Sequence, residues 1–156
     1  MLSTEDARVQ EKAWNAVVDI VARSGSIDLV REWDRIIVET GQAQRHMQFL
    51  AEVALRWQKR DDLKAATISV LEMLAQVQLE QGKWQAAVPV IRDLLARSNE
   101  NPGLERALQW LLVAGQQAVK EGKRSDAQHI VQEAQSFLSR CPNLTPEFEK
   151  LDKAAK

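Results

Sequence analysis

Three glycines recur along the chain at a nearly constant spacing, and this regularity constrains the fold more than any other feature. Gly41, Gly82 and Gly122 are separated by 41 and 40 residues. A second class of turn signal, rich in Asp, Asn and Pro, falls about midway between them, near Asp61, Asn101 and Asn143. Together the two classes interrupt the chain about every 20 residues, so the intervening segments must each form one regular element.

The segments between these turns have the apolar spacing of amphipathic helices. In residues 62–81, for example, Leu71, Leu74 and Val77 recur at intervals of three. Gly82 follows directly and is suited to end the helix in a left-handed turn. No segment alternates as a half-buried strand does. We therefore expect eight helices, at residues 4–23, 27–40, 43–59, 62–81, 84–98, 104–121, 124–140 and 146–154.

The composition agrees with an all-α protein and excludes several classes. Only 6 Gly and 4 Pro occur among 156 residues, and good helix formers are plentiful. The charges balance, 21 basic against 22 acidic, so no polybasic surface for nucleic acid is expected. No window approaches the apolar length of a membrane span, and no secretory signal is visible. One cysteine fits a reducing compartment. We expect a cytoplasmic protein that binds neither nucleic acid nor membrane.

The spacing also predicts an internal repeat of about 40 residues, each copy a pair of antiparallel helices. The sequences after two of the glycines are similar, Gly-Lys-Trp-Gln-Ala-Ala at 82–87 and Gly-Lys-Arg-Ser-Asp-Ala at 122–127. In both, a small residue (Ala87 or Ala127) allows the paired helices to approach closely. We expect one domain over residues 1–156, with repeat units at 27–60, 62–100 and 104–141 and flanking helices at 4–23 and 146–154.

These residues resemble the tetratricopeptide repeat (TPR). From Ser69 to about Asn99, the apolar anchors, the small residue, the turn glycine and the aromatic residue after it are matched by Leu71, Leu74, Ala75, Gly82, Trp84 and Ala87. The stretch from Gln109 to Arg140 is similar, except that Arg124 stands where an aromatic residue is usual. TPR units have 34 residues, whereas these are longer, like the variant helical repeats in the sensor regions of bacterial regulators. The resemblance implies an α–α superhelix; an up-and-down helical bundle is the alternative.

The TPR resemblance also implies a concave groove, lined by the first helix of each pair, that binds a peptide or helix of a partner. The groove positions are Asp28, Arg31, Arg35, Glu72, Gln76, Glu80, Gln109, Gln116 and Lys120. These side chains are mixed in charge and rich in amides, which suits a polar or amphipathic segment. The alternative is that they are ordinary solvated surface positions.

Two of the five tryptophans are candidates for interface anchors. Trp14 lies in the first helix, and Trp57 lies beside charged residues near the end of the third. Tryptophan is enriched at binding interfaces. Packing into the core is the alternative for both.

The remaining residue types give no sign of catalysis. His46 and His129 have no cysteine or second histidine at metal-ligand spacing. Nothing beside Cys141 would activate its thiol, and no phosphate-binding loop or nucleophile motif occurs. We therefore expect no enzyme activity, metal or cofactor. The sequence favours a protein-interaction module that acts as a scaffold, chaperone or sensor; the alternative is a self-associating structural domain, for instance a homodimer.

Overall fold

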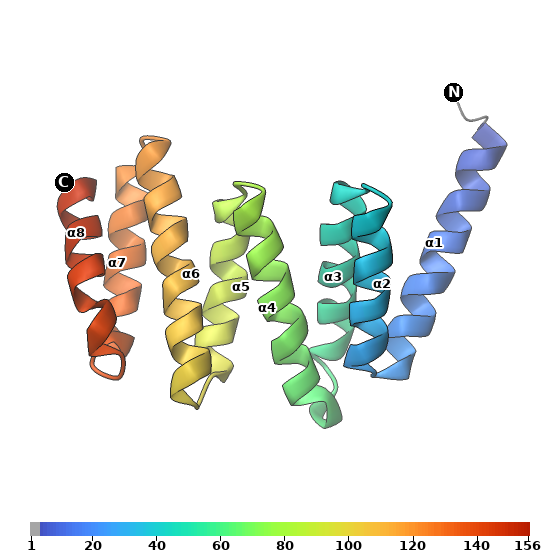
Figure 1. Cartoon of the computed structure of the whole chain (residues 1–156), viewed down its shortest axis with the longest axis horizontal. Helices are drawn as coiled ribbons and strands as arrows, with labels where there is room; N and C mark the ends of the chain where they lie inside the picture. Colours follow the sequence, from blue (N-terminus) through green and yellow to red (C-terminus); the bar gives the residue numbers. More distant parts are fainter. Residues whose placement is uncertain (1–3) are drawn as a thin grey trace. The chain divides into compact units, whose positions relative to one another are not determined.

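The computed structural model describes residues 4–156, and this part of the chain is built from helices without a strand (Figure 1). The all-α prediction is therefore confirmed. The eight α-helices within residues 4–156 are α1 (Thr4–Ser24), α2 (Ile27–Glu39), α3 (Ala43–Trp57), α4 (Lys64–Glu80), α5 (Trp84–Arg97), α6 (Asn101–Lys120), α7 (Arg124–Leu138) and α8 (Thr145–Ala155). Short 3-10 turns, Asp61–Leu63 and Pro142–Leu144, precede α4 and α8. None of these helices combines the length and apolar character needed to cross a bilayer.

Most helix ends lie within two residues of the predicted ones, and α6 is the main exception. It begins at Asn101, three residues earlier than expected. Pro102 lies in the first turn of this helix, where its missing N–H costs no hydrogen bond and its fixed φ suits the helix. The proline therefore belongs to the helix and does not precede it.

The three glycine turns share one conformation. Gly41, Gly82 and Gly122 have φ values of 70°, 70° and 74°. The N–H of each glycine donates to the carbonyl three residues earlier at 3.0 Å. The next N–H donates to the carbonyl five residues earlier, at 3.4, 2.8 and 2.8 Å, which satisfies the last carbonyls of the helix. This left-handed geometry costs a residue with a Cβ about 1–2 kcal/mol, which explains the glycines.

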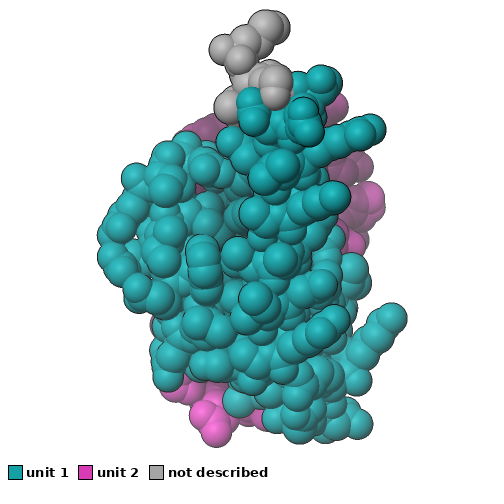
Figure 2. Space-filling view, turned by 90° about the vertical axis from the view of Figure 1, so that its right-hand side faces the viewer, with its two compact units in different colours: residues 1–70 teal, residues 71–156 magenta. Residues whose placement is uncertain are grey.

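The chain divides into two compact units, residues 1–70 and residues 71–156, with the boundary inside α4 (Figure 2). The single domain over residues 1–156 stays a prediction.

In the first unit, α3 packs against both α1 and α2. Phe49, Val53 and Trp57 on α3 are fully buried. The indole N–H of Trp57 donates to the Ala22 carbonyl of α1 at 2.8 Å, so this ring is held by a hydrogen bond as well as by packing.

In the second unit, α6 is the central helix. It packs against α5, α7 and α8, and its buried face includes Leu104, Leu108 and Leu111. On one side the Arg106 guanidinium reaches Glu72 of α4 at 2.8 Å. On the other side Gly115 meets Leu151 of α8 without room for a Cβ. Helices α4, α6 and α8 thus form one layer of this unit, and α5 and α7 form the other. The predicted helix-crossing alanines, Ala87 of α5 and Ala127 of α7, are fully buried.

Candidate functional site

The structure places six of the predicted groove residues on one surface of the second unit. Glu72, Gln76 and Glu80 recur along α4, and Gln109, Gln116 and Lys120 recur along α6. All are exposed except Glu72, which is half-buried by its ion pair with Arg106. The Gln76 amide donates to Glu80 at 2.9 Å. We call this surface the α4–α6 face.

Sequence reasoning missed two members of this face. Arg106 and Val113 are exposed on α6. Arg106, Gln109, Val113, Gln116 and Lys120 follow one another at intervals of three and four, so they form a single helical stripe. The same spacing in the sequence could have identified them. The α4–α6 face therefore carries both charge signs, several amides and, in Val113, an apolar side chain that is 36% exposed.

The other three predicted groove residues lie on α2 in the first unit. Asp28, Arg31 and Arg35 are exposed. Arg31 pairs with Asp28 at 3.6 Å, and Arg35 pairs with Glu32 and Glu39. The hydrogen bond from Arg35 lowers the pKa of the Glu32 carboxyl. Ion pairs between residues three or four apart are typical of a solvated helix surface. The contacts of Asp28, Arg31 and Arg35 therefore agree with the alternative that these are ordinary surface positions.

The two candidate interface tryptophans have different environments. Trp57 is wrong as an anchor: it is fully buried and bonded to Ala22, so it offers no surface to a partner. The Trp57 side chain fills the core between α3 and α1. The polar residues that follow it in the sequence gave no sign of this burial. Trp14 is half-buried between α1 and α3. The ring centres of Trp14 and Phe49 lie 6.2 Å apart in an edge-to-face arrangement, and the Arg45 guanidinium lies 4.8 Å from the centre of the Trp14 ring.

The two histidines lie in different units and have different surroundings. His46 of α3 forms a partly buried pair with Asp34 of α2 and so connects these helices. Burial raises the pKa of the Asp34 carboxyl, and the nearby His46 partly offsets this. His129 of α7 is exposed. No group of three potential metal ligands comes together within residues 4–156.

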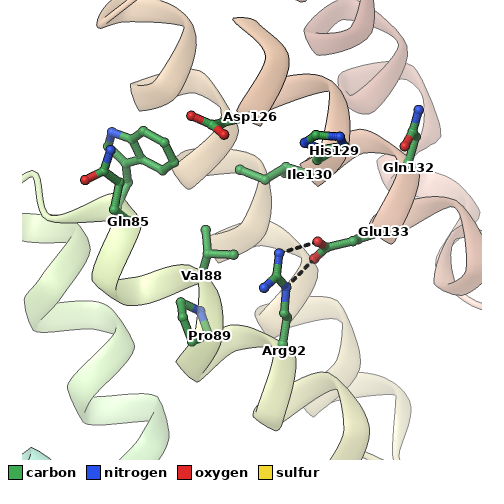
Figure 3. A pocket seen from close by; sticks show the side chains of 10 residues that line it. Gln85, Val88, Pro89, Arg92, Asp126, His129, Ile130, Gln132 and Glu133 are labelled. Atoms are coloured by element: carbon green, nitrogen blue, oxygen red, sulfur yellow. Dashed lines mark hydrogen bonds and ion pairs between the residues drawn. The ribbon is translucent and has the colours of Figure 1, made fainter. Parts of the chain in front are cut away.

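A pocket of about 560 Å³ lies on the opposite layer of the second unit, between α5 and α7 (Figure 3). We call it the α5–α7 pocket. The buried side chains of Val88 and Ile130 lie in its middle. At one end, Arg92 and Glu133 form a two-point ion pair, with Nε and Oε2 2.8 Å apart. The other lining residues are Trp84, Gln85, Pro89, Asp126, His129 and Gln132.

One lining residue of this pocket, Pro89, lies in the interior of α5. In an unbroken helix, the N–H of residue 89 would donate to the Gln85 carbonyl. Pro89 has no N–H, so this helical bond cannot form, and the carbonyl keeps its capacity to accept another hydrogen bond. Sequence reasoning did not predict this pocket, although a proline six residues into a helix is a signal that could have drawn attention to it.

Comparison with protein-family models, with curated proteins and with solved structures finds no match to this chain.

Proposed function

We propose that this chain is a non-catalytic protein-interaction module, a TPR-like helical repeat that binds a peptide or helix of a partner protein in the cytoplasm. Its binding surface would be the α4–α6 face, as part of the groove that the TPR resemblance implies. A scaffold, a chaperone and a sensor all use such a surface in the same physical way.

The observation that carries this proposal is the make-up of the α4–α6 face. Gln109 and Gln116 are exposed amides that each donate and accept hydrogen bonds. A polypeptide backbone presents both kinds of group, so amides of this kind suit it. Val113 lies between them on the same stripe and would contact an apolar side chain of the partner.

Site-specific photo-crosslinking in the native extract tests this proposal. A photoreactive side chain at Gln109 should capture a partner, whereas the same group at exposed Glu149 of α8 should not. Binding of the purified partner should then weaken on Glu80→Lys and stay unchanged on Glu149→Lys, which makes the same charge change on another helix. Equal capture from both positions, or an affinity for the partner that Glu80→Lys does not change, would overturn the proposal.

Self-association is a second candidate, and the outer side of α1 favours it. Val9, Ala13, Ala16 and Ile20 form an apolar stripe at intervals of four, three and four. Val9 and Ile20 are 62% and 63% exposed. Light scattering over a range of concentrations should show a dimer that Ile20→Glu dissociates and that Val38→Glu, at an exposed apolar position on α2, leaves intact. A monomer at every concentration would exclude this candidate.

A further inference from the structure

We propose that the α5–α7 pocket is a second binding site, which takes an amphipathic helix of a partner that carries a lysine or arginine beside its apolar stripe. This inference rests on the protein-binding function proposed above and adds a surface on the opposite layer of the second unit. Its evidence is the shape of the pocket, its apolar middle and its unbalanced charge.

The shape fits a helix. On α7, Asp126, Ile130 and Glu133 are spaced four and three residues apart, so they lie on one side of that helix. Gln85, Val88 and Arg92 give α5 a matching stripe. The two helices run in parallel, since Arg92 and Glu133 join them at a separation of 41 residues and, just beyond their C-terminal ends, Arg140 donates to the Asn99 carbonyl at the same separation. Two parallel stripes with a hollow between them form the kind of groove into which the side-chain ridge of a third helix packs.

The pocket combines an apolar middle with polar ends. Val88 and Ile130 lie between Asp126 at one end and the Arg92–Glu133 pair at the other (Figure 3). They are 7% and 2% exposed, so they form the floor of the pocket, and the exposed Pro89 beside them supplies the apolar surface that an occupant contacts. The two ends of the α7 stripe are seven residues apart, which is about 10 Å along the helix. An occupant therefore needs apolar side chains over the middle and polar groups about a turn away on each side, as an amphipathic helix has.

The charge of the pocket selects a basic occupant. Arg92 and Glu133 neutralise each other through two hydrogen bonds. Asp126 makes no ion pair among the described residues, so its carboxylate is the unbalanced charge of the lining. The positive end of the α7 dipole offsets about half a charge at most.

Two synthetic helical peptides test this inference on the full chain. Both carry leucines at positions i, i+4 and i+7, and they differ at one flanking position, which is lysine in one peptide and glutamate in the other. Each is titrated into isotope-labelled protein, and the amide signals are followed by NMR. We expect the lysine peptide to shift the signals of Val88, Ile130 and their neighbours and to bind on the order of tenfold more tightly than the glutamate peptide.

Exchange of the charge gives the decisive comparison. Asp126→Lys should reverse the preference, so that the glutamate peptide binds more tightly. Asp126→Asn, a milder change at this exposed position, should abolish the preference. Glu149→Lys, which makes the same charge change at an exposed position on α8, should leave it as it is. Preserved amide dispersion in each variant shows that the fold is intact.

Four results would overturn the inference. Equal affinity for the two peptides would remove the role of charge, and the absence of shifts at millimolar peptide would remove the site. Shifts confined to Gln109, Gln116 and their neighbours would support the α4–α6 face and refute this pocket, so the two proposals fail separately. If the pocket signals shift with protein concentration alone, while light scattering shows a rising mass, a second copy of this chain is the occupant and a partner helix is not.

Discussion

The close approach of α6 and α8 at Gly115 gives the sharpest prediction, because two effects of known size oppose each other there. In a helix interior, Gly→Ala gains about 1 kcal/mol of stability from helix propensity. A Cβ on residue 115 would overlap with Cδ2 of Leu151 and lie 3.3 Å from Cγ2 of Ile130. Leu151 and Ile130 are 4% and 2% exposed, so neither can swing into solvent. Overpacking of this kind costs about 1–3 kcal/mol, and we expect Gly115→Ala to destabilise the protein by about 0–2 kcal/mol.

A double-mutant cycle separates the two effects. Leu151→Ala alone should cost about 2–5 kcal/mol, because it removes a buried side chain. In that background the overlap is gone, so Gly115→Ala should now gain about 1 kcal/mol. The free energies come from urea unfolding followed by circular dichroism, fitted for the second unit if the units unfold separately.

The difference between the effects of Gly115→Ala in the two backgrounds is the refutable claim. Coupling should be well above the error of additivity, which is about 0.5 kcal/mol. Gly103→Ala is the matched control, since its nearest neighbour, the Ser98 hydroxyl, would be at an ordinary 3.5 Å. If Gly115→Ala stabilises the wild type as much as it stabilises Leu151→Ala, the helices do not meet at this glycine.

Three further predictions concern single residues. Gly122→Ala should cost about 1–2 kcal/mol from backbone strain alone, because a Cβ there meets nothing within 4 Å; Gly122→Asn should cost less, and equal unfolding midpoints for wild type and Gly122→Ala would contradict the left-handed turn. Trp57→Phe should cost about 1–3 kcal/mol by leaving the Ala22 carbonyl without its donor, measured by urea unfolding of the first unit, and a neutral result would refute the hydrogen bond. Burial, with a contribution from the charge of Glu105, raises the pKa of the Cys141 thiol. The unfolded thiol ionises first, near pH 8.5, so stability should fall as the pH rises above that value, and this part of the pH dependence should be absent in Cys141→Ala.

Local features of the sequence predicted the helices well because residues close to each helix end determine where the helix stops. Gly82 and Gly122 end helices through their own left-handed backbone. The α6 boundary was misplaced because Pro102 can either precede a helix or occupy its first turn, and local sequence does not separate these cases. Trp57 is buried because α3 packs against α1, where its indole meets the Ala22 carbonyl 35 residues away, and the polar residues beside Trp57 in the sequence give no sign of this contact.

The site was harder to predict for the same reason. The resemblance placed candidate residues on first helices, and within α4 and α6 the face could be read from helical spacing. The α5–α7 pocket depends instead on how α5 and α7, which are far apart in the sequence, lie beside each other in the fold. Helix α6 fills the space between α5 and α7 on the inner side, packing against both, while on the outer side their link includes long polar side chains such as Arg92 and Glu133.

The pocket lies where long polar side chains connect α5 and α7 and, among the described residues, no apolar side chains fill the space between the two helices. Arg92 and Glu133 are 41 residues apart, whereas Glu72 and Arg106, which join neighbouring helices of the other layer, are 34 apart. The ion pairs that connect neighbouring helices therefore span different sequence separations in the two layers of the second unit. The exposed surfaces of the two layers also differ in composition. The α4–α6 face offers amides along a stripe, and the α5–α7 pocket offers an apolar hollow with one unbalanced carboxylate. Under the two proposals made above, a partner bound at the α4–α6 face by backbone hydrogen bonds leaves the α5–α7 pocket free, so the second unit would hold two different segments at once.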